Sequence, residues 1–181
     1  MVRISRTLIL LFTISALAVA SQNDPKFSPK AQERITKEVR HKLLMLPQFG
    51  TFDNIAFKLE GYDVILLGQV VDPTLRTDAE REAKKVEGVE RVENRIEVLP
   101  TSPNDDRIRR AVFIAIYRYG PLQRYGIGSN RPIHIIVNNG HVTLIGMVDR
   151  ESDKSLVGIR ANGVEGVFSV QNDLLVPEKR H

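Results

Sequence analysis

The sequence contains one phrase twice, and this duplication constrains the fold more than any other feature. The first copy reads VEGVERVENRIEV from Val86 to Val98, and the second reads VEGVFSVQNDLLV from Val164 to Val176, at an offset of 78. Farther upstream, Arg34-Ile35 matches Arg107-Ile108 at an offset of 73, so the second copy carries five extra residues in between. A period near 75 residues is too long for a solenoid repeat and predicts a duplicated small domain.

Each copy reads as helix, strand, strand, helix, strand. Both first helices begin at a Ser-Pro pair, Ser28-Pro29 and Ser102-Pro103, where serine can cap free amides and proline suits the first turn. In the second copy the two strands flank Asn139-Gly140, a hairpin turn signal because both residues tolerate positive φ. The apolar residues of the first helices lie at helical spacing: Ile35, Val39, Leu43 and Leu46, then Ile108, Val112, Ala115, Ile116 and Tyr119.

This order predicts an α+β protein of two tandem αββαβ domains. Each domain is expected to be a small three-stranded mixed sheet packed by two helices, with a right-handed crossover into the last strand. The linker is short and rich in proline, which should hold the two domains close together. The expected divisions are a lead-in over 21–30, domain 1 over 31–99, the linker over 100–104, domain 2 over 105–177 and a tail over 178–181.

The N-terminus has the features of a secretory signal. Arg3 and Arg6 precede an apolar run from Thr7 to Val19, which is short of the roughly 20 residues that a membrane span needs. The run ends in the small-x-small pattern Ala18-Val19-Ala20. We therefore expect a signal peptide over 1–20, cleaved from the mature protein, with an uncleaved N-terminal anchor as the alternative.

The amino-acid composition limits which cellular compartment and which class of binding partner fit this chain. The chain has no cysteine, which is common in a bacterial periplasm and unusual among disulfide-stabilised extracellular modules of animals. Without residues 1–20 it carries 24 basic and 22 acidic side chains. This balance is too mild and too mixed for a nucleic-acid-binding protein. A periplasmic location is therefore predicted, with no nucleic acid as partner.

The tandem αββαβ order behind a secretory signal resembles the BON domain family of bacterial envelope proteins. So does the closing phrase Gly-Val-x-x-Val-x-Asn of each copy, with a glycine ending the second strand. These motif residues are Gly68, Gly88 and Asn94, then Gly146, Gly166 and Asn172. The resemblance covers Ala31 to Leu99 and Asp105 to Val176. It implies binding of phospholipid at bacterial membranes, a role in osmotic or envelope stress and, in some members, assistance to outer-membrane proteins.

The motif residues themselves are expected to be structural. Gly88 and Gly166 stand between a helix and a strand, where glycine ends the helix with a positive φ. Asn94 and Asn172 are polar at positions that otherwise point inward. Their side chains are expected to satisfy nearby backbone groups rather than a ligand.

A surface for lipid is predicted in the second copy, where the extra residues lie. The stretch from Tyr117 to Arg131 interleaves tyrosine with arginine and contains no acid. Tyrosine suits the boundary between apolar and wet surroundings, and arginine attracts anionic head groups. The predicted lipid-binding residues are Tyr117, Arg118, Tyr119, Arg124, Tyr125, Arg131, Lys154 and Arg160. The alternative is that Tyr119 fills the core, Arg118 is a solvated helix end and the remainder is a loop.

The sequence lacks several common catalytic motifs, so no enzymatic activity is predicted. The sequence has no cysteine nucleophile, HExxH, GxSxG or Walker loop. His134 and His141 flank the hairpin turn but lie several residues apart along the ladder, so they are not expected to share a metal. Asp105 and Asp106 are interpreted as helix N-terminal charges favoured by the helix dipole. Catalytic residues, cofactors and metals are therefore not predicted.

The predicted function is that of a non-enzymatic periplasmic protein. It would bind the surface of an anionic phospholipid membrane through its second domain and support envelope integrity. One alternative is a chaperone-like or protein-interaction module for outer-membrane or secreted proteins, which would bind through a sheet edge or a groove. Another is a purely structural domain pair that docks into a larger envelope complex.

Overall fold

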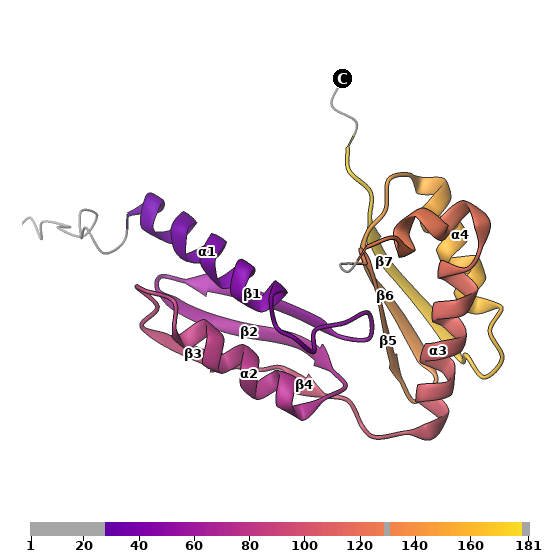
Figure 1. The fold of residues 1–181 in the computed structure, drawn as a ribbon, viewed down its shortest axis with the longest axis horizontal. Coiled ribbons are helices and arrows are strands. Elements are labelled where there is room, and N and C mark those ends of the chain that lie inside the picture. The colour runs from indigo at the N-terminus through magenta and orange to yellow at the C-terminus, as the bar shows by residue number, and fades with distance from the viewer. Residues whose placement is uncertain (1–27, 129–130, 179–181) are drawn as a thin grey trace, which may run out of the picture.

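The computed structural model describes residues 28–128 and 131–178, which form two α+β domains joined by a short linker (Figure 1). The predicted signal peptide, most of the lead-in and the end of the tail lie outside the described residues. The elements follow the predicted order helix, strand, strand, helix, strand in both copies. Within the described ranges, no helix is both long and apolar enough to span a membrane.

Both helices of the first domain begin at a capping side chain, and the first begins at the predicted Ser28-Pro29 pair. Ser28 Oγ accepts a hydrogen bond from the Ala31 amide (3.2 Å), and Asp72 Oδ1 accepts one from the Thr74 amide (2.7 Å). Each cap is followed directly by a proline, whose missing N–H costs nothing in the first turn. The elements are α1 (Pro29–Leu44), β1 (Asn54–Glu60), β2 (Asp63–Val70), α2 (Pro73–Lys84), β3 (Arg91–Asn94) and β4 (Glu97–Val98).

The closing strand of the first domain is divided, whereas the sequence predicted one strand. β1 pairs antiparallel with β2, and both β3 and β4 pair parallel with the other edge of β2. At the division, Asn94 Oδ1 accepts a hydrogen bond from the Ile96 amide at 3.1 Å. In the second domain the equivalent bond, from the Leu174 amide to Asn172 Oδ1, is longer at 3.4 Å, and β7 is not divided. A side-chain bond of this kind can compete with the regular ladder. The sheet therefore has three strand positions, the third occupied by two short segments.

The second domain repeats this plan with one addition. Its elements are α3 (Pro103–Tyr117), η2 (Gly120–Gly126), β5 (Ile133–Asn138), β6 (His141–Met147), α4 (Glu151–Asn162) and β7 (Ser169–Leu175). The extra residues of the second copy include η2, a 3-10 helix, where the sequence had suggested only a loop. η2 is held in place because Leu122 and Tyr125 are buried.

The β5–β6 hairpin turns at the predicted Asn139-Gly140 pair, with φ of 52° and 79°. An unpredicted interaction holds this turn. Both carboxylate oxygens of Asp105, a residue at the start of α3, accept a backbone amide of the turn at 2.9 Å. Asp105 is only 1 % exposed, so it acts mainly as a cap of the hairpin and not merely as a helix N-terminal charge.

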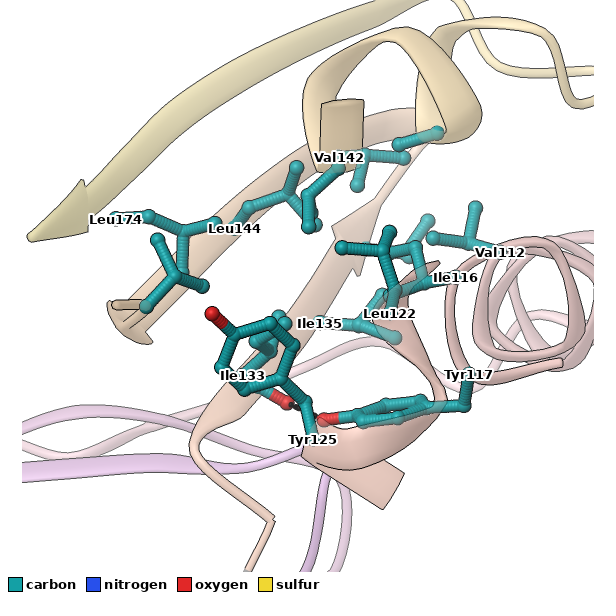
Figure 2. Packing of buried hydrophobic residues seen from close by; sticks show 14 of the residues in the cluster. Val112, Ile116, Tyr117, Leu122, Tyr125, Ile133, Ile135, Val142, Leu144 and Leu174 are labelled. Carbon is teal, nitrogen blue, oxygen red and sulfur yellow. Dashed lines mark hydrogen bonds between the residues drawn. The ribbon is translucent and has the colours of Figure 1, made fainter. Parts of the chain in front are cut away.

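Each domain has its own hydrophobic core between the helices and one face of the sheet. In the second domain, side chains from α3 and η2 meet those of β5, β6 and β7 (Figure 2). Ile116, Leu122 and Leu144 are fully buried there. The 3-10 helix therefore belongs to the core, because Leu122 is enclosed by residues of the helix and the sheet.

A loop of the first domain docks against the second. This docking loop, residues 49–53, lies beside the outer edge of β5 in Figure 1. The Ile135 amide donates a hydrogen bond to Thr51 O (2.7 Å), and His134 Nδ1 lies 3.2 Å from Gly50 O. The loop thereby occupies backbone groups at a sheet edge that would otherwise be free.

Aromatic rings reinforce the contact of the docking loop. The rings of Phe49 and His134 stack with centroids 5.3 Å apart, and those of Phe52 and Phe113 meet edge to face at 6.2 Å. Phe52 packs against the core of the second domain. The two domains are thus joined by a packed contact as well as by the linker.

A buried carboxylate at the end of the docking loop should make stability depend on pH. Asp53 is 6 % exposed and accepts hydrogen bonds from the amides of Val71 (2.9 Å) and Gly50 (3.1 Å). Burial raises the pKa of Asp53 above its usual 3.8, although the bonds from Val71 and Gly50 oppose the shift. The native state therefore binds this proton more tightly than the unfolded chain, and the stability it contributes is lost as the pH rises through the raised pKa.

Asp53→Asn is expected to abolish this pH dependence. The free energy of unfolding of the wild type, minus that of the variant, should fall as the pH rises above about 4. Urea unfolding at several pH values measures the difference. Glu90→Gln, which changes an exposed carboxylate without an ion pair among the described residues, is the matched control and should give a curve parallel to that of the wild type. A parallel curve for the Asp53 variant as well would contradict the prediction.

Candidate functional site

Two tyrosines of the predicted lipid-binding stretch lie inside the second domain (Figure 2). Tyr117 and Tyr125 are each 6 % exposed. The Tyr117 hydroxyl donates a hydrogen bond to Ile133 O (2.7 Å), and burial raises the pKa of Tyr117 to about 12. Neither side chain can meet a membrane surface while the domain is folded. This corrects the expectation for both, since the sequence alternative placed only Tyr119 in the core.

Arg124 is held by carboxylates at the start of α4. Its guanidinium forms ion pairs with Asp153 and, at 3.3 Å, with Asp149. The Tyr125 hydroxyl joins the same network by donating to Asp153 (2.8 Å) and accepting from the Asp149 amide (2.8 Å). Burial raises the pKa of Tyr125. Arg124 therefore links η2 to α4 through ion pairs, while 43 % of its side chain remains exposed, and its role in lipid binding stays a prediction.

Arg131 covers aromatic rings. Its guanidinium carbon lies 5.3 Å from the ring centroid of Phe113 and 5.9 Å from that of Tyr117. These are cation–π distances, and the side chain is half-buried. Because Phe113 also contacts Phe52 of the docking loop, Arg131 lies at the margin of the contact between the domains.

The remaining predicted residues lie on the helical side of the second domain. Arg160 Nε donates a hydrogen bond to Ala115 O (3.1 Å), and its guanidinium carbon lies 4.7 Å from the ring centroid of Tyr119. Tyr119 is half-buried, Arg118 is exposed and Lys154 is half-buried. The bond from Arg160 brings α3 and α4 together, so Arg118, Tyr119 and Arg160 gather where the two helices meet.

Three further residues belong to this surface and were missed by the sequence analysis. Ile114 is 48 % exposed and Ile159 is 67 % exposed, and Arg110 is exposed one turn before Ile114. Four-residue spacing from Arg110 through Ile114 to Arg118 places these side chains along one face of α3. That spacing was present in the sequence. We refer to the whole surface as the α3–α4 face: Arg110, Ile114, Arg118, Tyr119, Ile159 and Arg160.

The cations of this face form no ion pairs within the described ranges, although Arg110 shares a surface hollow with Asp53, Asp72 and Asp106. Within the described ranges, no carboxylate lies at ion-pair distance from Arg110, Arg118 or Arg160. Nine ion pairs are found in the first domain and three in the second. The net charge differs in the same direction, with 11 basic and 13 acidic residues over 31–99 against 9 and 7 over 105–177. Positive charge is therefore free mainly in the second domain.

The repeated glycines are structural because of their close surroundings. Gly68 and Gly146 have φ of +117° and +128°, and a Cβ at these positions would lie 2.0 Å from Asn54 O and 1.9 Å from Pro132 O. Only glycine allows the hairpin partners to approach so closely. The other pair, Gly88 and Gly166, has φ of +91° and +89° between helix and strand.

The repeated asparagines attach the closing strand to the preceding helix. Asn94 Nδ2 donates a hydrogen bond to Arg76 O at 2.9 Å, and Asn172 Nδ2 donates one to Lys154 O at 2.8 Å. Both acceptors are backbone carbonyls in the first half of a helix. The two asparagines of the duplicated phrase therefore hold the same packing together in both copies.

His134 and His141 have separate partners. His134 lies against Gly50 of the docking loop, and His141 Nδ1 lies 2.7 Å from Ser169 Oγ. Among the residues that the structure describes, no group of three His, Cys, Asp or Glu side chains could hold a metal ion.

Comparison with known structures shows only distant likeness. A structural protein of the type III secretion system of Chlamydia trachomatis, CdsD, is 11 % identical, with a TM-score of 0.31 over 80 % of this chain and 94 % of that chain. The C-terminal domain of CdsD is also 11 % identical, with a TM-score of 0.27 over 78 % and 96 % of the two chains. No curated protein matches the sequence.

A match to a protein family covers most of the described chain. The model of the BON domain matches residues 31–100 and 122–178, which together make up more than half of the 181 residues. The first segment spans α1 to β4, and the second begins within η2 and continues through β7. The two matches fall on the two copies of the repeat. The chain therefore belongs to the BON domain family.

Proposed function

We propose that this BON domain protein is a non-enzymatic periplasmic protein that binds anionic phospholipid surfaces through the α3–α4 face and supports envelope integrity. Membership of a family associated with the envelope and with phospholipid supports the general assignment. One observation supports placing the lipid-binding surface on this face. Its three arginines form no ion pairs among the described residues, and the face also includes two exposed isoleucines. The predicted signal peptide and the lack of cysteine support the compartment.

The composition of the α3–α4 face suits a membrane surface. Each arginine near an anionic leaflet contributes about 1 kcal/mol, so Arg110, Arg118 and Arg160 together supply about 3 kcal/mol. Ile114 and Ile159 can enter the boundary between head groups and acyl chains, as apolar residues of interfacial helices do. The expected attachment is reversible and weakens with salt, because exposed charges are screened.

The position of the face leaves it open to a membrane. In Figure 1, α3 and α4 cover the side of the second sheet that faces away from the first domain. The docking loop bonds to the edge of β5, and its Phe52 meets Phe113 at the side of α3. A flat surface could therefore approach the helices without displacing the contact between the domains.

The test is binding to vesicles of phosphatidylglycerol and phosphatidylethanolamine at low salt. The triple variant Arg110→Ala, Arg118→Ala, Arg160→Ala is expected to bind about 100-fold more weakly than the wild type, because about 3 kcal/mol of attraction is lost. Co-sedimentation at increasing vesicle concentration measures the partition constant. Circular dichroism checks that loss of the Arg160 bond to Ala115 leaves the fold intact.

The matched control removes the same number of charges elsewhere. Arg81 and Lys84 lie in the last turn of α2 and Lys85 is its C-cap, and all three pair with acidic neighbours. Their triple replacement by alanine should change the partition constant much less. Equal losses in both triple variants would show that net charge alone drives binding and would reject the α3–α4 face. Failure of the wild type to bind anionic vesicles at low salt would reject the proposed function.

A further inference from the structure

A second surface, unrelated to the α3–α4 face, lies between the two domains. A cleft of about 440 Å³ is lined by seven residues of the first domain and seven of the second. Most of them belong to strands and point away from the helices, so the open faces of both sheets form its walls. Its volume is within the range of roughly 300–1,000 Å³ that is typical of ligand sites.

The charge of the cleft is opposite to that of the chain as a whole. Its walls contain two carboxylates, Glu97 from β4 and Asp173 from β7, and no lysine or arginine. Over the described residues, Glu97 has no ion pair, and the Asp173 side chain accepts a hydrogen bond only from the side-chain Nε2 of Gln171 (2.8 Å). The complete sequence has 26 basic against 22 acidic residues. Negative potential is therefore concentrated in a cleft of a protein that is basic overall.

The other polar groups of the cleft are mainly side-chain amides. Asn54 and Gln69 come from the first domain, and Asn138 and Gln171 from the second. Asn138 Oδ1 is buried and has no hydrogen-bond partner among the described residues. A buried acceptor without a partner is costly, so an N–H donor entering the cleft would be stabilised there. Amides can both donate to and accept from a peptide backbone.

We propose that this cleft binds an extended peptide segment that carries lysine or arginine side chains. Glu97 and Asp173 would pair with the cations, one from each wall, and the amides would bind the peptide backbone. Ile136 and Ile145 would pack against the aliphatic parts of the bound side chains. Since the walls belong to different domains, the docking loop, which joins them, sets the width of the site.

Fluorescence anisotropy of a fluorescein-labelled Lys-Thr-Lys-Thr-Lys peptide tests the proposal with the full mature chain. The double variant Glu97→Gln, Asp173→Asn is expected to bind at least about tenfold more weakly, because two charge-assisted contacts are lost. The matched control Glu90→Gln, Glu165→Gln removes one exposed carboxylate from each domain outside the cleft. This control should bind within about twofold of the wild type.

A second variant keeps the test decisive. Thr143→Arg puts a cation on a strand position that lines the cleft and should abolish peptide binding while the fold, followed by circular dichroism, is retained. The variant in which all three arginines of the α3–α4 face are replaced by alanine should bind the peptide as tightly as the wild type. Failure of the lipid proposal would therefore leave the peptide proposal standing. No binding by the wild type, or equal losses in the double variant and its control, would overturn the proposal. Spermine binding as tightly as the peptide would overturn the assignment to a peptide.

Discussion

Gly146→Ala is expected to unfold the second domain under conditions in which the wild type is folded. The residue pairs with Ile133 across the β5–β6 hairpin, and its φ is +128°. An added Cβ would lie 1.9 Å from Pro132 O, well inside any contact distance, and backbone cannot move aside as a flexible side chain can. Relief requires the hairpin to open where Met147 N donates to Pro132 O (3.1 Å).

The expected loss for Gly146→Ala is about 4 kcal/mol or more, a value reached only by mutations with a severe structural cause. Small domains have little stability to spare, so this loss approaches the total for the domain. Thermal unfolding followed by circular dichroism measures it. Gly120→Ala is the matched control, because no atom lies within 4 Å of its added Cβ and its φ is not positive. A melting curve of Gly146→Ala that coincides with that of Gly120→Ala would contradict the prediction.

Asp105→Ala is expected to destabilise the protein by about 2–4 kcal/mol. The substitution leaves the amides of Asn139 and Gly140 without the acceptors that now lie 2.9 Å away. Each buried donor without a partner costs about 1–3 kcal/mol. Gly140 is buried in the turn, so water cannot fully replace the carboxylate there. Asp105→Asn should lose less, because its amide oxygen can keep one of the two bonds.

Urea unfolding and hydrogen exchange together test the role of Asp105. The amides of Asn139 and Gly140 should exchange faster in Asp105→Ala than in the wild type. Asn104→Ala is the control from the same helical turn, since Asn104 is exposed and bonds only to Arg107 (3.2 Å). Its stability should stay within about 0.5 kcal/mol of the wild type. Unchanged exchange at the turn in Asp105→Ala would show that the carboxylate does not hold it.

Much of the fold could be predicted because its signals are local. Ser28-Pro29, Ser102-Pro103 and Asp72-Pro73 begin helices in the structure, since capping depends only on residues within one turn. Asn139-Gly140 makes the hairpin turn for the same reason. The division of the last strand at Asn94 was not predicted, because the repeated phrase forms the same asparagine bond in the undivided β7 and does not distinguish the two copies.

The surroundings of the residues predicted to bind lipid could be predicted less well. The stretch after α3 has no helical or strand periodicity, so the pattern alone does not tell which of its side chains point inward. Tyr125 is buried because η2 folds over the core. Arg124 forms an ion pair with Asp153, which lies 29 residues farther along the chain. The two isoleucines of the α3–α4 face were not predicted, because they stand outside the buried stripes of their helices and periodicity marks only the buried side.

By itself the sequence determined that one αββαβ domain occurs twice, where most elements begin, and that the second copy has the freer positive charge. These properties follow from periodicity and capping, which act over a few residues, and from composition, which is a total over the chain and needs no knowledge of contacts. Only the tertiary structure decided that Arg110, Ile114 and Arg118 share a surface with Ile159 and Arg160, and that both sheets open onto one cleft. Such contacts join residues far apart in the chain, and packing between elements, not local preference, brings them together.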